Sequence, residues 1–147
     1  MLDTANPLPG HKVLDTFVGK WKTSGCVRDS AGNKTAEVTG TDIYEWLPGN
    51  FFLLHKADVI IDGSREQTTE ILGFDQSAKE YFMHYFDNHG NSGTMKARLT
   101  EGTWTFLSES LRFTDAFSED GHIMSGKWEQ CADGKNWMPW MDIKLSR

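Results

Sequence analysis

The sequence predicts an all-β protein: an antiparallel up-and-down β-barrel of about ten strands with a short N-terminal helical segment. Apolar and polar residues alternate with a period of two along most of the chain, and turn sequences interrupt the alternation at nearly regular intervals. No helical stretch is long enough to connect parallel strands. Because a twisted sheet of this size curls on itself and closure removes its exposed edges, we expect a closed barrel.

The strands are delimited by turn signals built mainly from Gly, Asp, Asn, Pro and Ser. In order, these are RDSAGN (28–33), LPGN (47–50), IDGS (61–64), FDQSAK (74–79), DNHGNSG (87–93), TEGT (100–103), SEDGH (118–122) and ADGKN (132–136). The expected strands are residues 20–28, 35–47, 51–61, 65–74, 80–87, 93–100, 103–109, 111–118, 122–131 and 136–146. Residues 8–17, LPGHKVLDTF, favour a helical turn or two, which we expect to plug one end of the barrel. All 147 residues are expected to form one domain, with residues 1–10 as a flexible N-terminal segment.

Composition narrows the range of partners and compartments. Aromatic residues make up 12% of the chain, which implies wide apolar surfaces in a core or around a cavity. The net charge of -6 disfavours nucleic acid and anionic membranes as partners, because both attract basic patches. The N-terminus lacks an export signal, and no run approaches the roughly 18 apolar residues that would span a bilayer. We therefore expect a cytoplasmic protein.

The two cysteines, Cys26 and Cys131, lack the close spacing that zinc binding or thioredoxin-like redox chemistry requires. In a reducing compartment we expect both to be small, half-buried hydrophobic residues. A disulfide and a reactive thiol are the alternatives. No metal site is predicted from them.

The stretch FVGKWKTSG (17–25) marks the start of the first strand. Gly19 allows the entering segment to pack closely against the strand, and the large indole of Trp21 suits the narrow closed end of a barrel. Gly19, Lys20 and Trp21 reproduce the glycine–any–tryptophan signature at the first strand of lipocalins and other calycins. The chain therefore resembles the calycin superfamily, which implies a lipocalin-like barrel with structural roles for Gly19 and Trp21.

Longer blocks narrow this resemblance. They are FVGKWKTSG, GTDIYEWLPGNFFLLH (40–55), EILGFD (70–75), YFDNHG (85–90) and RFTDAFSEDGHIMSGKWEQCADGKNWMPWM (112–141), and together they span nearly the whole chain. They resemble the recurring blocks of a bacterial family of calycin-like barrels described as a domain of unknown function. The resemblance implies the fold and a lipocalin-like cavity, without an activity, a substrate or catalytic residues.

Two better-characterised groups of related barrels differ from this chain. Fatty-acid-binding proteins carry two lid helices between the first and second strands, where this sequence has only RDSAGN. Haem-binding, nitrobindin-like barrels continue the signature with further glycines and place a haem-ligating histidine on a late strand. Here Thr23, Ser24 and Gly25 follow the tryptophan, and the last histidine, His122, lies beside a turn. We therefore expect no cofactor, and haem in particular is disfavoured.

Alternation assigns side chains to the inner face of the barrel. The residues expected to face inward are Trp21, Tyr44, Trp46, Phe51, Leu53, His55, Met124, Trp128, Trp137, Met141 and Ile143. The segment YFMHYF (81–86) is apolar on both faces, so alternation does not decide between His84 and Tyr85, and its outer face suggests a subunit interface, such as that of a homodimer. The candidate ligand-binding residues are Tyr44, Trp46, Leu53, His55, Tyr85, Met124, Trp128 and Met141.

Three charged or titratable residues have open roles. His55, on an apolar face, is a polar handle for a ligand, a proton acceptor, or a core histidine satisfied by a tyrosine, Glu70 or a backbone carbonyl. Arg112 lies between apolar residues and is either an anion anchor inside the barrel or a solvated arginine at a strand start. Glu70 has an unresolved face and is a potential partner of either residue.

Signals of enzymatic activity are few. The sequence has no glycine-rich phosphate loop, no nucleophile elbow and no pair of histidines at metal spacing, so no catalytic residue is assigned. The sequence therefore favours a protein that binds a small, largely apolar ligand inside an aromatic-lined barrel. The alternatives are a solidly packed barrel that acts through oligomerisation or protein contact, and an isomerase-like or cyclase-like enzyme that uses His55 with Glu70.

Overall fold

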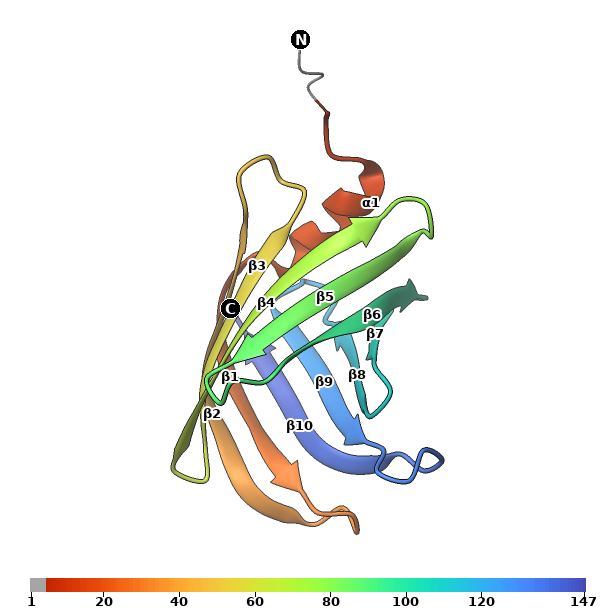
Figure 1. The fold of residues 1–147 in the computed structure, drawn as a ribbon. Helices are drawn as coiled ribbons and strands as arrows, with labels where there is room; N and C mark the ends of the chain where they lie inside the picture. Colours follow the sequence, from red (N-terminus) through yellow and green to blue (C-terminus); the bar gives the residue numbers. More distant parts are fainter. Residues whose placement is uncertain (1–4) are drawn as a thin grey trace.

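A computed structural model describes residues 5–147 as a closed barrel of ten antiparallel strands, with a short helical segment at one end (Figure 1). The predicted fold class is confirmed. The strands are β1 (Gly19–Arg28), β2 (Lys34–Trp46), β3 (Leu53–Ile61), β4 (Ser64–Asp75), β5 (Glu80–Asp87), β6 (Ser92–Thr100), β7 (Thr103–Leu107), β8 (Leu111–Phe117), β9 (Ile123–Gln130) and β10 (Met138–Ser146).

Each strand pairs with the next along the chain, and β1 pairs with β10 to close the barrel. The turn chemistry explains the tight reversals. At the β3–β4 hairpin, Asp62 and Gly63 both adopt positive φ values, 50° and 78°, which short polar residues and glycine tolerate best. The expected strands therefore agree with the observed ones to within about two residues at their ends.

The N-terminal segment plugs one end of the barrel. It comprises α1 (Pro9–Lys12) and the 3₁₀ helix η1 (Val13–Phe17), as residues 8–17 predict. Leu14 and Phe17 are 0% and 1% exposed, so η1 inserts its apolar side into the barrel. The tyrosine hydroxyl of Tyr81 donates to the carbonyl of Gly10 over 2.8 Å, which ties α1 to β5. Residues 1–4 of the segment 1–10, which we expected to be flexible, lie outside the described residues.

Trp21 closes the same end from within the first strand. Its ring is 1% exposed, and its indole nitrogen donates to the carbonyl of Phe17 over 2.8 Å. The guanidinium carbon of Arg147 lies 4.2 Å from the ring centre and covers its outer side. The indole therefore joins β1, η1 and the C-terminal residue into one closed end.

The inward-facing side chains form three layers. The closed end contains Trp21, Phe17 and Phe117, whose rings pack together with centroids 5.2–6.1 Å apart. The middle layer contains His55 on β3 and Asp115 on β8. On its own strand, each lies two residues further from the plugged end than an inward residue of the closed-end layer, which is Leu53 on β3 and Phe117 on β8. Beyond it, the interior is lined by partly exposed residues and is described below.

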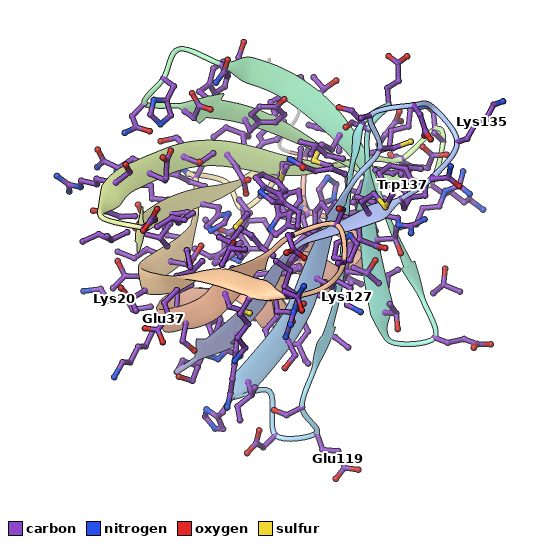
Figure 2. All side chains as sticks on the ribbon, turned by 90° about the horizontal axis from the view of Figure 1, so that it is seen from below. Lys20, Glu37, Glu119, Lys127, Lys135 and Trp137 are labelled. Atoms are coloured by element: carbon purple, nitrogen blue, oxygen red, sulfur yellow. The ribbon has the colours of Figure 1, made fainter. Side chains whose placement is uncertain are left out.

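Charged side chains cover the outside. Lys20, Glu37, Glu119 and Lys135 lie at the periphery of the molecule when it is viewed from below (Figure 2).

No helix among residues 5–147 is long and apolar enough to cross a membrane.

Two residues expected to face inward from a strand do not. Phe51 lies before the start of β3 and packs edge-on against His11 of α1, with ring centroids 5.3 Å apart. Trp137 lies before β10, and its ring stacks on Arg112, which pairs with the outward Glu129. Trp137 therefore lies on the outer surface. The pairing of β9 with β10 shifts register between Pro139 and Met141, so alternation from Met141 does not extend back to Trp137.

Candidate functional site

The middle of the barrel contains a buried ionic cluster formed by Asp42, His55 and Glu70, here called the His55 cluster. Strand register brings the three together, because His55 pairs directly with Glu70 of β4 and lies diagonal to Asp42 of β2. The three residues are 6–9% exposed. His55 Nε2 lies 2.6 Å from Asp42 Oδ1, and His55 Nδ1 contacts Glu70 Oε1. The Thr23 hydroxyl donates to the other oxygen of Asp42, which completes that carboxylate's contacts.

The two carboxylates keep His55 protonated. Burial lowers the pKa of His55, but the opposing effects of Glu70 and Asp42 are larger in sum and raise it to about 9. With both ring nitrogens donating to carboxylates, the imidazolium has no free lone pair. His55 is therefore better suited to hold a charge than to accept a proton from a substrate.

Tyr44 covers one face of the His55 ring. The two rings are 3.8 Å apart and almost parallel, at 6°. Burial, and after it the charges of Asp42, Glu70 and Asp115, raise the pKa of Tyr44 well above its ordinary value, so the phenol keeps its proton. A neutral phenol stacked on an imidazolium adds a favourable cation–π contact to the cluster.

Asp115 is the second titratable group of the middle layer. It is 2% exposed, and neither carboxylate oxygen has a hydrogen-bond partner among the described residues. Its neighbours across the sheet are Trp104 of β7 and Gly126 of β9, and the indole N–H of Trp104 makes no hydrogen bond to it. Burial raises its pKa to about 7. An unpaired buried carboxyl is costly to the fold and marks a position where function is to be sought.

Above this layer, several inward-facing side chains are partly exposed. The residues concerned share the inward face of their strands with buried neighbours, yet each is only partly buried. They are Ala57, Val59, Thr68, Tyr85, Phe113, Trp128 and Ile143, here called the lumen residues. Val38, which pairs with Gly25 of β1 on the same inward face, is 1% exposed. Phe113 and Trp128 pack with ring centroids 4.7 Å apart and form its most aromatic part.

The structure divides the eight candidate ligand-binding residues between the two halves of the barrel. His55, Tyr85, Trp128 and Met141 lie in the middle layer or the lumen, and Tyr44 lies directly against His55. Leu53 and Met124 are 0% and 2% exposed and belong to the packed core at the plugged end. Trp46 donates its indole N–H to Asp15 of η1 over 2.9 Å, which places it at that end too.

The structure defines which face of the barrel Glu70, His84 and Arg112 occupy, which the sequence left undecided. Glu70 faces inward and pairs with His55, whereas His84 is exposed on the outside of β5. Arg112 faces outward and pairs with Glu129 over 3.0 Å, so it anchors no anion inside the barrel. Its pairing partner was not apparent from the flanking apolar residues.

Sequence reasoning missed Asp42, Asp115 and Thr23. The signal was present, because Asp42 precedes the inward Tyr44 by two positions and Asp115 falls between Phe113 and Phe117. A carboxylate at an inward position of an apolar alternation is a candidate for a buried functional group.

Other candidate chemistry is limited. Cys26 and Cys131 are both buried and free. Within residues 5–147, no group of three His, Cys, Asp or Glu side chains is placed to hold a metal ion. A depression of about 660 Å³ lies on the surface between Phe52, Phe74 and Phe82, with the β4–β5 turn at its rim. The middle layer and the lumen are thus the chemically distinctive region.

Comparison with known proteins agrees with this architecture. The crystal structure of Rv2717c from M. tuberculosis has a TM-score of 0.71 to this chain, covering 97% of it and 99% of that chain, at 14% sequence identity. At that identity the likeness extends to the fold alone. A comparison with curated proteins gives no significant match.

A family profile is more specific. The profile described as "Protein of unknown function (DUF1579)" matches residues 6–119, which include the Gly19–Trp21 signature, the His55 cluster and Asp115. The matched region covers most of the barrel, from the plug to the end of β8. The chain therefore belongs to the DUF1579 family.

Proposed function

We propose that this protein binds a small, largely apolar molecule in the lumen of its barrel. The observation that carries the proposal is the partial exposure of the lumen residues, which face inward in a closed barrel whose other end is packed solid. Inward side chains that remain accessible border a space open to solvent, and most of those here are apolar or aromatic. Ligand sites in β-barrels commonly lie in such mouths.

The His55 cluster supports an orienting role at the floor of this lumen. Ligand pockets combine apolar walls with a few fixed polar groups, and the cluster is fixed by its contacts with Thr23 and by the stacked ring of Tyr44. Ala57, the next inward residue on β3, is small and adds no long side chain above His55. The cluster therefore gives the ligand one polar end and leaves the apolar walls to bind the rest.

Quenching of tryptophan fluorescence tests this proposal. Titration with a fatty acid, a retinoid and haem should change the emission for at least one class of ligand, because Trp128 lies in the lumen. The response should decrease in Trp128→Phe and persist in Trp137→Phe, the matched change on the outer surface. A flat response to every class, or an equal response in both variants, would count against lumen binding.

A second candidate function is contact between two copies of the chain. The register places Leu54, Ile71 and His84 in one row on the outer face of β3–β5, and Phe86 on the same face is 54% exposed. A row of this kind supports a homodimer interface. Sedimentation equilibrium should then show a dimer that Ile71→Lys converts to a monomer, whereas a monomeric wild-type protein would exclude this candidate.

A further inference from the structure

Asp115 faces the His55 cluster from the opposite wall of the barrel. In the order of the ten strands, β8 is separated from β3 by four strands on either side, so the two strands lie across the barrel from each other. Both residues occupy the middle layer: Asp115 is followed by Phe117 at the plugged end, and His55 is preceded by Leu53 there. The charge of Asp115 acts on Tyr44, which stacks on His55, so the opposing groups are close enough to influence each other.

The cross-strand neighbours of Asp115 leave its carboxyl without a hydrogen-bond donor. On β9 its cross-strand neighbour is Gly126, which places no side chain in the interior. A methyl group added at Gly126 would come 2.3 Å from the Phe113 ring and 3.1 Å from Asp115 Cβ, so the Phe113 ring fills the space over Gly126 and packs beside Asp115. Towards the mouth, Phe113 and Trp128 form an aromatic wall that leads to Asp115.

The interior carries an excess of acidic groups. The buried His, Asp and Glu residues are His11, Asp42, His55, Glu70 and Asp115, and no lysine or arginine among residues 5–147 is buried. The arginines that form ion pairs do so on the outer face, as Arg28 does with Asp142 and Arg112 with Glu129. His55 is already shared between Asp42 and Glu70, so no cation of the described protein neutralises Asp115.

We infer that the lumen is selective for amphiphilic amines, whose protonated amino group pairs with Asp115 while the apolar body lies against Phe113, Trp128 and Tyr85. This inference deepens the proposed function and rests on it. An ammonium group supplies the donors that both orphan oxygens lack, and charge-assisted hydrogen bonds are stronger in a dry interior than in water. The aromatic wall adds a cation–π attraction. A carboxylate ligand would instead meet the acidic interior and be rejected.

Binding of an amine should also move a proton. Burial raises the pKa of Asp115 to about 7, so the group is partly protonated near neutral pH. A bound ammonium ion favours the ionised carboxylate, and the displaced proton, roughly 0.5 per ligand at pH 7, goes to the buffer. The titratable groups that face Asp115 are Tyr44 and the His55 cluster, and the raised pKa values of Tyr44 and His55 keep both protonated at this pH.

Isothermal titration calorimetry with three matched probes tests the inference. The probes are octylamine, 1-octanol and octanoate, and each titration is repeated in two buffers with different enthalpies of ionisation. We expect octylamine to bind at least about tenfold more tightly than octanol, octanoate to bind most weakly, and only octylamine to release protons. In Asp115→Asn, the preference for the amine and the proton release should both be lost, whereas Asp133→Asn, an exposed change, should keep both.

The outcomes separate this inference from the proposed function. If octanol and octanoate bind as tightly as octylamine, or if Asp115→Asn keeps the amine preference, the lumen binds apolar molecules but the role of Asp115 is wrong. If none of the three probes binds, and the fluorescence titrations are also flat, the proposed function itself fails. If Asp115→Asn does not fold, the wild-type titrations still test the inference. Equal affinities for the three probes, or no proton release with octylamine, would contradict it.

Discussion

Asp115 is a buried carboxyl whose cost to the fold depends on pH. Its pKa rises from 3.8 in the unfolded chain to about 7 in the folded protein. The penalty is absent below the unfolded pKa, where both states are protonated, grows as the pH rises, and is complete above pH 7. Such a residue stabilises nothing in the free protein, which is why we assign it a function with a bound ligand.

Replacing Asp115 should therefore stabilise the protein at high pH relative to low pH. The free energy of unfolding of Asp115→Asn, compared with that of the wild type, should increase by roughly 2–3 kcal/mol between pH 5 and pH 8. Urea denaturation at both pH values measures this difference. Asp133→Asn serves as the control: the pKa of Asp133 is about 2, so its difference from the wild type should stay constant over this range. A constant difference for Asp115→Asn would show that the carboxyl is paired.

His55 has the opposite sign of contribution, because its charged form is the one that the fold stabilises. The folded pKa of about 9 exceeds the ordinary value of 6.5, so the stabilisation is complete below pH 6.5 and is lost as the pH rises through 9. His55→Gln leaves Asp42 and Glu70 without their shared partner and should lower the free energy of unfolding by about 3–5 kcal/mol at pH 6.

The pH dependence identifies the cause. The loss in His55→Gln should be smaller at pH 9.5 than at pH 6, by roughly 2–3 kcal/mol, because the wild type no longer benefits from the charge. His84→Gln, on the exposed face of β5, should change the stability by less than about 0.5 kcal/mol at either pH. An equal loss for His55→Gln at both pH values would show that packing, not charge, explains the effect.

For single residues, the sequence predicted which face of the barrel a side chain occupies better than it predicted which residues that side chain contacts. Alternation placed His55 inward, and the structure agrees, but three kinds of partner remained open for it. His55 contacts Glu70 and Asp42 because of the register between β2, β3 and β4. Alternation within a single strand gives no information about that register. Asp115 was overlooked because a buried carboxyl without a partner is an exception to the preferences that sequence patterns reflect.

The strands themselves were predictable because local chemistry defines them. Nearly every hairpin contains Gly, Asp or Asn where the backbone turns, and the alternation between hairpins specifies which face is buried. The prediction failed at two element boundaries, Phe51 and Trp137, where a loop and a register shift interrupt the period of two. Alternation is therefore reliable only within a continuous ladder.

The helical plug should contribute strongly to stability through a single side chain. Phe17 of η1 packs on Tyr44, Trp104 and Phe117 and is 1% exposed, so Phe17→Ala should lower the free energy of unfolding by about 3–5 kcal/mol. Val13→Ala changes the same helix at a residue that is 38% exposed and should cost less than about 1 kcal/mol. Thermal or urea unfolding compares the two, and equal small losses would mean that η1 is not part of the core.

The whole molecule is a barrel with one packed end and one accessible end. The plugged end joins Trp21, Phe17 and Arg147 around a closed base, while the other half retains inward residues that solvent can reach. The polar middle layer lies between them, with the His55 cluster on one wall and Asp115 on the other. Packing thus supplies stability at one end, and the proposed ligand site lies at the other.

Native mass spectrometry tests the central claim, that the lumen holds one small molecule, most directly. The protein, purified without detergent and incubated with octylamine and with apolar probes such as a retinoid, should gain the mass of one ligand per chain, and denaturation should release it. The ion of the ligand-bound chain should be less abundant in a variant whose larger side chain fills the lumen, such as Ala57→Trp on β3. If only the mass of the ligand-free chain is detected with every probe, the account is contradicted.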